Sequence, residues 1–202
     1  MNKTLGVFIL LCFLTHTSLF GQCPTPIAGD FTINTPCTGD IVVSGNSGGQ
    51  PDVLTINAAV TGNITVSNQR KEIVINSAGS VSGSVIVNQQ QVDVIVNGPI
   101  GTDLDINAQQ VNVELASDIG GSFDLGDRQV DVDVVGDATV GSIVSSGQIN
   151  DFIVDNGDNA VSITLTVSND FCIEDQQNSI QTSADDIVNI FGTVKCTGTG
   201  CN

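Results

Sequence analysis

The 202-residue chain has no tryptophan, no tyrosine, one histidine and only five basic residues. Proteins that bind nucleic acid need clustered lysine and arginine for the phosphates, and commonly stack the bases on aromatic rings. This chain instead carries 22 acids, which give a formal net charge of −17. A surface of this sign repels other polyanions, so nucleic acid is excluded as a partner.

The N-terminal segment has the pattern of a secretory signal. Lys3 precedes an apolar run over residues 5–14, and the small residues Ser18 and Gly21 follow. A run of this length is too short for a membrane helix, which must cross a ~30 Å hydrocarbon core, and no later run is long enough either. We therefore expect residues 1–21 to be a cleaved signal peptide and the mature protein to be secreted or held at the cell surface.

An alternative for this segment is a lipoprotein signal that acylates Cys23, although Gln22 before it is bulkier than the small residue such signals carry.

Cleavage after Gly21 would remove His16 and leave four basic residues against 22 acids, a net charge of −18. Histidine is a frequent general base and zinc ligand. Its absence from the mature chain argues against catalysis and against a zinc site.

Five cysteines remain after cleavage, and they lie near the two ends of the chain: Cys23, Cys37, Cys172, Cys196 and Cys201. In an exported protein this placement predicts disulfide-stapled ends. Cys23 with Cys37 is the natural local pair. Cys172 pairs with Cys196 or with Cys201, which leaves one odd thiol, Cys201 in the first case.

The middle of the chain repeats every 19 residues. Residues 93–111, 112–130 and 131–149 form three rows of this length, and residues 72–92 form a similar row before them. Weaker rows lie on both sides. Within each row apolar residues alternate with polar ones or glycine, a pattern typical of short strands with one apolar face. Each row therefore predicts a strand, a Gly-rich turn, a second strand and a polar turn.

At this spacing the apolar residues fall into six columns. A single row cannot bury its apolar face, so the rows must stack, and stacking at the ~4.8 Å strand spacing turns each column into a continuous ridge. An antiparallel sandwich or barrel is the alternative, but its strands would not keep a register of 19. The columns are Val92, Val111, Val130 and Ile149; Val94, Val113 and Val132; Val96, Leu115 and Val134; Val81, Ile100, Ile119 and Ala138; Leu104 and Phe123; and Ile106, Leu125 and Val144.

The predicted fold is an all-β solenoid, or parallel β-helix, of about seven coils without helices. The chain divides into a signal peptide (1–21), an N-terminal cap with the first strands (22–52), the solenoid repeats (53–170) and a C-terminal coil with its cap (171–202). Gly101 and Gly120 mark the turn between the strands of a row. Asparagines close the strands and are expected in left-handed turns, namely Asn57, Asn76, Asn97, Asn88 and Asn107.

The rows over about 53–170 resemble the right-handed parallel β-helix repeats of bacterial surface adhesins of the filamentous-haemagglutinin type. The resemblance rests on Val/Ile alternation with Gly and Asn turns, and it implies a fold more than a function. A fainter likeness is to curli-type amyloid subunits, suggested by Gln89 to Gln91, Gln109 and Gln110. The regular Gln and Asn spacing inside curli strands is missing, because Val and Ile occupy those positions.

The acids also form columns. Asp118, Asp137 and Asp158 follow one line in the first turn, where stacked carboxylates repel one another and could attract weakly bound Ca²⁺. The competing interpretation is a solvated face screened by salt. Two further pairs, Glu114 with Asp133 and Asp105 with Asp124, are expected on strand faces.

Acids two residues apart, Asp103 with Asp105 and Asp131 with Asp133, are the nearest thing to a catalytic pair. Residues i and i+2 of a strand simply share a face, so a solubilising role is favoured over acid–base chemistry. Ice-binding solenoids need a regular threonine face. Threonine here is sparse and out of register, which argues against ice binding.

We therefore expect a non-catalytic structural or adhesive element of the cell exterior, without a cofactor unless Ca²⁺ binds weakly. Its partners would be cell-surface or extracellular matrix components, or other copies of itself. The alternative is a self-assembling fibre subunit in which an open coil end adds the next molecule's strand. Stapled ends favour the first, as a monomeric rod. A polysaccharide-active β-helix enzyme and an ice-binding protein are the less favoured functions.

Overall fold

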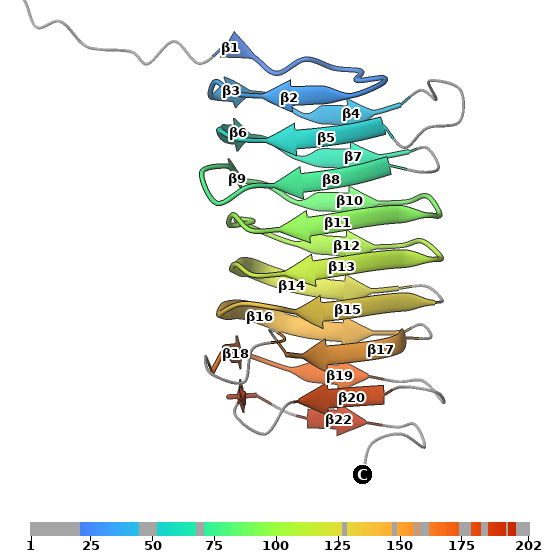
Figure 1. The fold of residues 1–202 in the computed structure, drawn as a ribbon, viewed down its shortest axis with the longest axis vertical. Helices are drawn as coiled ribbons and strands as arrows, with labels where there is room; N and C mark the ends of the chain where they lie inside the picture. Colours follow the sequence, from blue (N-terminus) through green and yellow to red (C-terminus); the bar gives the residue numbers. More distant parts are fainter. Residues whose placement is uncertain are drawn as a thin grey trace, which may run out of the picture.

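The chain folds into a rod of stacked coils, seen from the side in Figure 1. This computed structural model describes residues 21–44, 52–67, 71–126, 129–146, 149–155, 157, 162–173, 179–182, 186–192 and 194–196. Within these ranges there are only strands, turns and bends, with no helix and therefore none that could span a membrane. Every strand pairing is parallel, so the predicted parallel β-solenoid is confirmed.

Two long sheets run along the rod, and a four-stranded sheet at a corner is limited to its first coils. Beyond β9 that corner continues as the single bridges Val81–Ile100 and Ile100–Ile119. The eight-stranded sheet contains β2 (Phe31–Ile33), β5 (Asp52–Ile56), β8 (Lys71–Ile75), β11 (Val92–Val96), β13 (Val111–Leu115), β15 (Val130–Val134), β17 (Ile149–Val154) and β20 (Ser179–Thr182). The ten-stranded sheet contains β4 (Ile41–Val43), β7 (Ile64–Val66), β10 (Val85–Val87), β12 (Leu104–Ile106), β14 (Ile119–Leu125), β16 (Ala138–Ser145), β18 (Thr164–Val167), β19 (Phe171–Ile173), β21 (Ile187–Ile190) and β22 (Val194–Cys196). A four-stranded sheet at the corner contains β1 (Gly21–Gln22), β3 (Cys37–Thr38), β6 (Ala59–Thr61) and β9 (Ser80–Val81).

The core consists of the predicted apolar columns. Val94 of β11 pairs with Val113 of β13, which pairs with Val132 of β15, and all three side chains are buried. Leu104 pairs with Phe123 on the opposite side of the core, and both are completely buried. Each such side chain contributes about 1.5–3 kcal/mol of burial free energy. The central coils gain most from it, since Phe31 near one end and Ile187 and Phe191 near the other are exposed.

Two column members are wrong, because the coil of β15 and β16 does not keep the 19-residue spacing. Ile119 pairs with Val140 rather than with Ala138, and Leu125 pairs with Ser145 rather than with Val144. The register shifts between β14 and β16 at an irregularity after Ile119. A polar residue, Ser145, consequently occupies a completely buried position in an apolar column.

The asparagines stack rather than turn left-handed. The side-chain amide of Asn57 donates to Asn34 Oδ1 over 2.8 Å, and the amide of Asn76 donates to Asn57 Oδ1 over 2.6 Å. Among the described residues, the non-glycine positions with positive φ are three glutamines 19 residues apart: Gln91, Gln110 and Gln129. The expectation of left-handed asparagines is therefore wrong, since these side chains bond to the next coil instead.

Glycine is required where successive coils approach closely at the corner. A Cβ on Gly101 would overlap the carbonyl oxygen of Ser82, and a Cβ on Gly120 would overlap that of Gly101. The backbones are held together there by hydrogen bonds, such as Gly120 N–H to the carbonyl of Ile100 over 2.9 Å. The turn predicted from these two glycines is thus a line of backbone contact between coils.

Candidate functional site

An acidic column of two residues lies on the outer face of the ten-stranded sheet, between Ile86 of β10 and Val144 of β16. Asp105 of β12 pairs with Asp124 of β14, as the repeat spacing predicts. Burial raises the pKa of Asp105, and the charges of Asp103 and Asp124 raise it further; burial also raises the pKa of Asp124. These carboxylates are therefore harder to ionise in the folded chain than free aspartate is.

A second acidic column lies on the outer face of the eight-stranded sheet, where Glu114 of β13 pairs with Asp133 of β15. Burial raises the pKa of Asp133, and so do the charges of Asp131 and Asp151. A shallow hollow of about 270 Å³ lies over this column. Its lining consists of Glu72, Asp93, Val94, Ile95, Asn112, Val113, Glu114 and Asp133, with no basic side chain among them.

The paired acids considered for catalysis lie on these outer faces. Asp103 already accepts two hydrogen bonds from Ser122 in the next coil, one from its N–H over 2.8 Å and one from its hydroxyl over 3.2 Å. Asp131 and Asp133 point outward from β15 between the buried valines of that strand. The geometry therefore ties Asp103 to the backbone of the coil beside it.

The carboxylates of the proposed calcium column also bind backbone. Asp118 Oδ1 accepts the N–H of Thr139 over 2.7 Å, and Asp137 Oδ1 accepts the N–H of Thr164 over 2.8 Å. Asp158 lies outside the described residues. Within the described ranges, no three His, Cys, Asp or Glu side chains gather as a metal site would need. Each described carboxylate of this column thus uses one oxygen to link its coil to the next.

The cysteine pair at the N-terminal end is confirmed. Cys23 and Cys37 form a disulfide with a Cα–Cα distance of 4.9 Å, and both side chains are buried. At the other end, Cys172 of β19 is the backbone partner of Lys195. The backbone of Cys196 lies beside Ile173 instead. The side chain of Cys196 and all of Cys201 lie outside the described residues, so the second disulfide stays a prediction.

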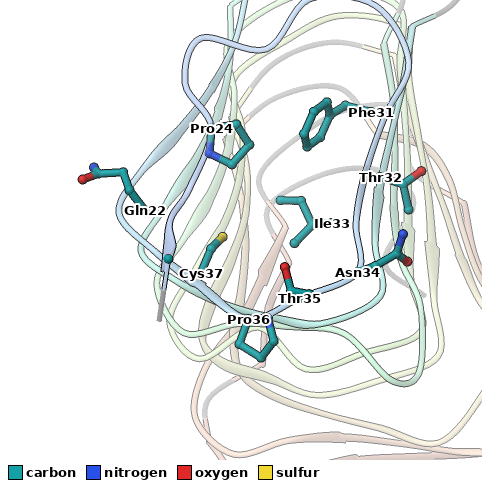
Figure 2. Close-up of a pocket in the computed structure, with 10 residues that line it drawn as sticks. Gln22, Pro24, Phe31, Thr32, Ile33, Asn34, Thr35, Pro36 and Cys37 are labelled. Atoms are coloured by element: carbon teal, nitrogen blue, oxygen red, sulfur yellow. The ribbon is translucent and has the colours of Figure 1, made fainter. Parts of the chain in front are cut away.

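The N-terminal end of the rod carries a cavity of about 560 Å³ that the sequence did not indicate. Figure 2 shows Pro24, Phe31 and Ile33 turned into the interior of the coil, while Gln22 and Thr32 point away from it. The lining contains no charged residue; it consists of Gly21, Gln22, Pro24, Phe31, Thr32, Ile33, Asn34, Thr35, Pro36 and Cys37. The 19-residue rows begin later in the chain, so their spacing could not show which residues of the first coil are left uncovered.

The charge is distributed unevenly along the rod. Residues 22–100 contain five acids and two basic residues, a formal charge of −3, whereas residues 101–202 contain 17 acids and two basic residues, a formal charge of −15. Because the coils stack in chain order, β1–β11 belong to the first part and β12–β22 to the second (Figure 1). The part of the rod formed by residues 22–100 is thus weakly acidic, and the part formed by residues 101–202 is strongly acidic.

Comparison of the chain with models of protein families, with curated proteins and with solved structures finds no match.

Proposed function

We propose that this chain is a non-catalytic structural or adhesive rod that works outside the cell, secreted or held at the cell surface. The observation that carries the proposal is the use of polar side chains to join one coil to the next. Asp118, Asp137 and Asp103 each accept a backbone N–H from the following coil. Such groups stiffen a rod, and they are then less available as acids or bases.

The disulfide between Cys23 and Cys37 supports an oxidising location, since disulfides persist mainly in exported proteins. The signal-like residues 1–21 support the same conclusion. The proposed attachment role has cell-surface or matrix components as partners, and it suits a repetitive rod with no tryptophan or tyrosine and few basic residues. No resident cofactor is part of this proposal.

Protease treatment of intact cells tests the location. Cells that produce the protein are exposed to a membrane-impermeant protease, and a cytoplasmic enzyme is followed as the control. We expect the rod to be digested, or recovered from the medium, while the control protein survives. Protection of the rod until the cells are broken would contradict an exterior location.

An activity assay on purified protein tests the non-catalytic part. We expect no release of sugar fragments from plant or microbial polysaccharides at any pH between mildly acidic and neutral. Fragment release that is lost in Asp131→Asn or Asp133→Asn would replace the structural role with an enzymatic one.

A further inference from the structure

Three glutamines on successive coils adopt a backbone conformation that glutamine disfavours. Gln91, Gln110 and Gln129 directly precede β11, β13 and β15, and their φ values are 61°, 59° and 61°. Residues with a Cβ rarely adopt this left-handed conformation, whereas glycine and asparagine adopt it more easily. The rod therefore carries glutamine here at a cost to its stability, which indicates that the side chain itself has a use. We call this edge of the rod the glutamine corner.

Hydrogen bonds between coils account for only part of that use. The amide of Gln91 donates to Gln110 Oε1 over 3.3 Å, and the amide of Gln90 donates to Gln109 Oε1 over 3.3 Å. Both bonds are longer than the usual N–H···O distance. In the described part of the chain, the side chain of Gln110 bonds through its oxygen alone, and no hydrogen bond ties the side chain of Gln129 to a neighbouring coil. These two side chains can therefore still bond to a ligand.

The same two side chains line a polar hollow on the outside of the rod. The hollow has a volume of about 270 Å³ and is lined by Gln110, Asn112, Gln129 and Asp131. Its two walls come from neighbouring coils, since Asn112 of β13 pairs with Asp131 of β15. The amide of Asn112 is held by Asp93 Oδ1 over 2.8 Å. The lining thus presents amide donors, amide acceptors and one carboxylate, on coils that follow one another every ~4.8 Å.

We propose that the glutamine corner binds a neutral polysaccharide that lies along the rod. Sugar hydroxyls both donate and accept hydrogen bonds, as the lining of the hollow requires. A hexose unit of an extended chain is about as long as the spacing between coils, whereas an extended peptide advances only ~3.3 Å per residue. The net charge of −17 disfavours acidic polysaccharides. This inference names a partner for the attachment role and therefore rests on the proposed function.

Binding at a single coil is weak, because the lining of the hollow contains no aromatic ring on which a sugar could stack. The affinity comes from hydrogen bonds, each of which contributes about two- to tenfold. A longer sugar chain reaches the glutamines of more than one coil at once, so its contacts add up. We therefore expect the affinity to rise with the length of the oligosaccharide.

Two substitutions at one position separate a binding role from a structural one. Gln129→Gly removes the side chain and suits the left-handed backbone, whereas Gln129→Ala removes the side chain without relieving the backbone. Both variants should bind sugar about two- to tenfold more weakly than the wild type. Only Gln129→Gly should also have a higher urea midpoint, because binding and stability make opposite demands at this position. Gln90→Ala removes an exposed amide outside the hollow and should bind as the wild type does.

Biolayer interferometry measures the binding of the full chain, purified as a secreting host exports it. The immobilised probes are neutral oligosaccharides of β-linked glucose, mannose, galactose and N-acetylglucosamine, with polygalacturonate as the acidic probe and oligoserine as the polypeptide probe. We expect binding to at least one neutral sugar and to neither of the other two probes.

Binding to none of the neutral sugars, tighter binding to polygalacturonate or oligoserine, or full binding by Gln129→Gly would overturn the proposal. A lower urea midpoint for Gln129→Gly would also overturn it, since the glutamine would then be kept for the fold. These measurements do not depend on where the protein acts. Their failure would therefore leave the exterior location standing, and protection from protease in intact cells would leave the sugar binding standing.

Discussion

At the scale of single residues, the rod depends on glycine where a side chain would enter the backbone of the neighbouring coil. Gly120 illustrates the requirement, because its position has no left-handed φ and is exposed to solvent. Conformational freedom is therefore not the reason for glycine there. The reason is the carbonyl oxygen of Gly101, which occupies the space that a Cβ would need.

Gly120→Ala should therefore lower the free energy of unfolding by about 1–3 kcal/mol, the usual cost of forcing extra atoms into a packed region. Gly126→Ala is the control, because its Cβ would meet the flexible end of the Asn107 side chain at 2.8 Å. Urea unfolding measures both. Equal midpoints for the two variants would mean that the coils separate easily at the corner.

Asp118 provides a second test at this scale, because its carboxylate has two competing interpretations. As an acceptor for the N–H of Thr139, it should tolerate Asp118→Asn, whereas Asp118→Ala should cost about 1 kcal/mol. If Asp118 is instead a calcium ligand, a chelator should lower the melting temperature of the wild type. Asp118→Asn and Asp118→Ala should then be destabilised equally when calcium is present. Thermal melts of the three proteins, with and without chelator, separate the two roles.

At the scale of strands and columns, the sequence predicts most of what the structure contains. Alternation and the 19-residue period place Val94, Val113 and Val132 in one column correctly, because burial on one face imposes the pattern directly. The errors at Ala138 and Val144 arise where β16 changes register. The irregularity falls at Gly120 and Gly121, and glycine inside a strand often marks a bulge. A fixed period takes no account of such a signal and extends past it.

The acidic columns were equally predictable, but their hydrogen-bonding partners were not. Glu114 and Asp133 pair as their spacing requires. The hydrogen bond from the Ser122 N–H to Asp103 depends on the exact backbone position of one coil relative to the next. Residue spacing alone does not give that position. The cavity at the N-terminal end was missed for a related reason, since it depends on how the first coils stack and not on the pattern of any single row.

The pair formed by Asp105 and Asp124 makes stability depend on pH. Their folded-state pKa values are raised, so the folded chain binds protons more tightly than the unfolded chain. Ionised, the pair destabilises the fold, and this effect is complete above the folded pKa values and disappears as pH falls below the unfolded ones. Lowering the pH from 7 towards the ordinary aspartate pKa of about 3.9 should therefore raise the urea midpoint.

The double variant Asp105→Asn with Asp124→Asn should be more stable than the wild type at pH 7 and should show a smaller change with pH. Glu72→Gln removes a charge from another coil and serves as the control for general repulsion. If the control flattens the pH dependence as much as the double variant does, net charge and not this pair is responsible.

At the scale of the whole molecule, each coil contacts only the coils beside it, so stability is local along the rod. The disulfide joins Cys23, just after β1, to Cys37 of β3, and so attaches the N-terminal segment to the first coil. Cys37→Ser should therefore increase amide exchange in β1 and β3 by roughly tenfold or more, while β13 and β15 keep their wild-type rates. Hydrogen exchange with mass spectrometry measures this. A uniform increase along the chain would show that the rod unfolds as one unit.

The uneven charge of the rod also gives it a preferred direction. A rod with −3 on one part and −15 on the other experiences a torque in an electric field, which orients its long axis. Beside an anionic envelope the acidic part is driven away, within a Debye length of about 8 Å at physiological ionic strength. Next to any anionic surface, a rod would therefore favour the orientation with β2 nearer that surface and β20 farther from it.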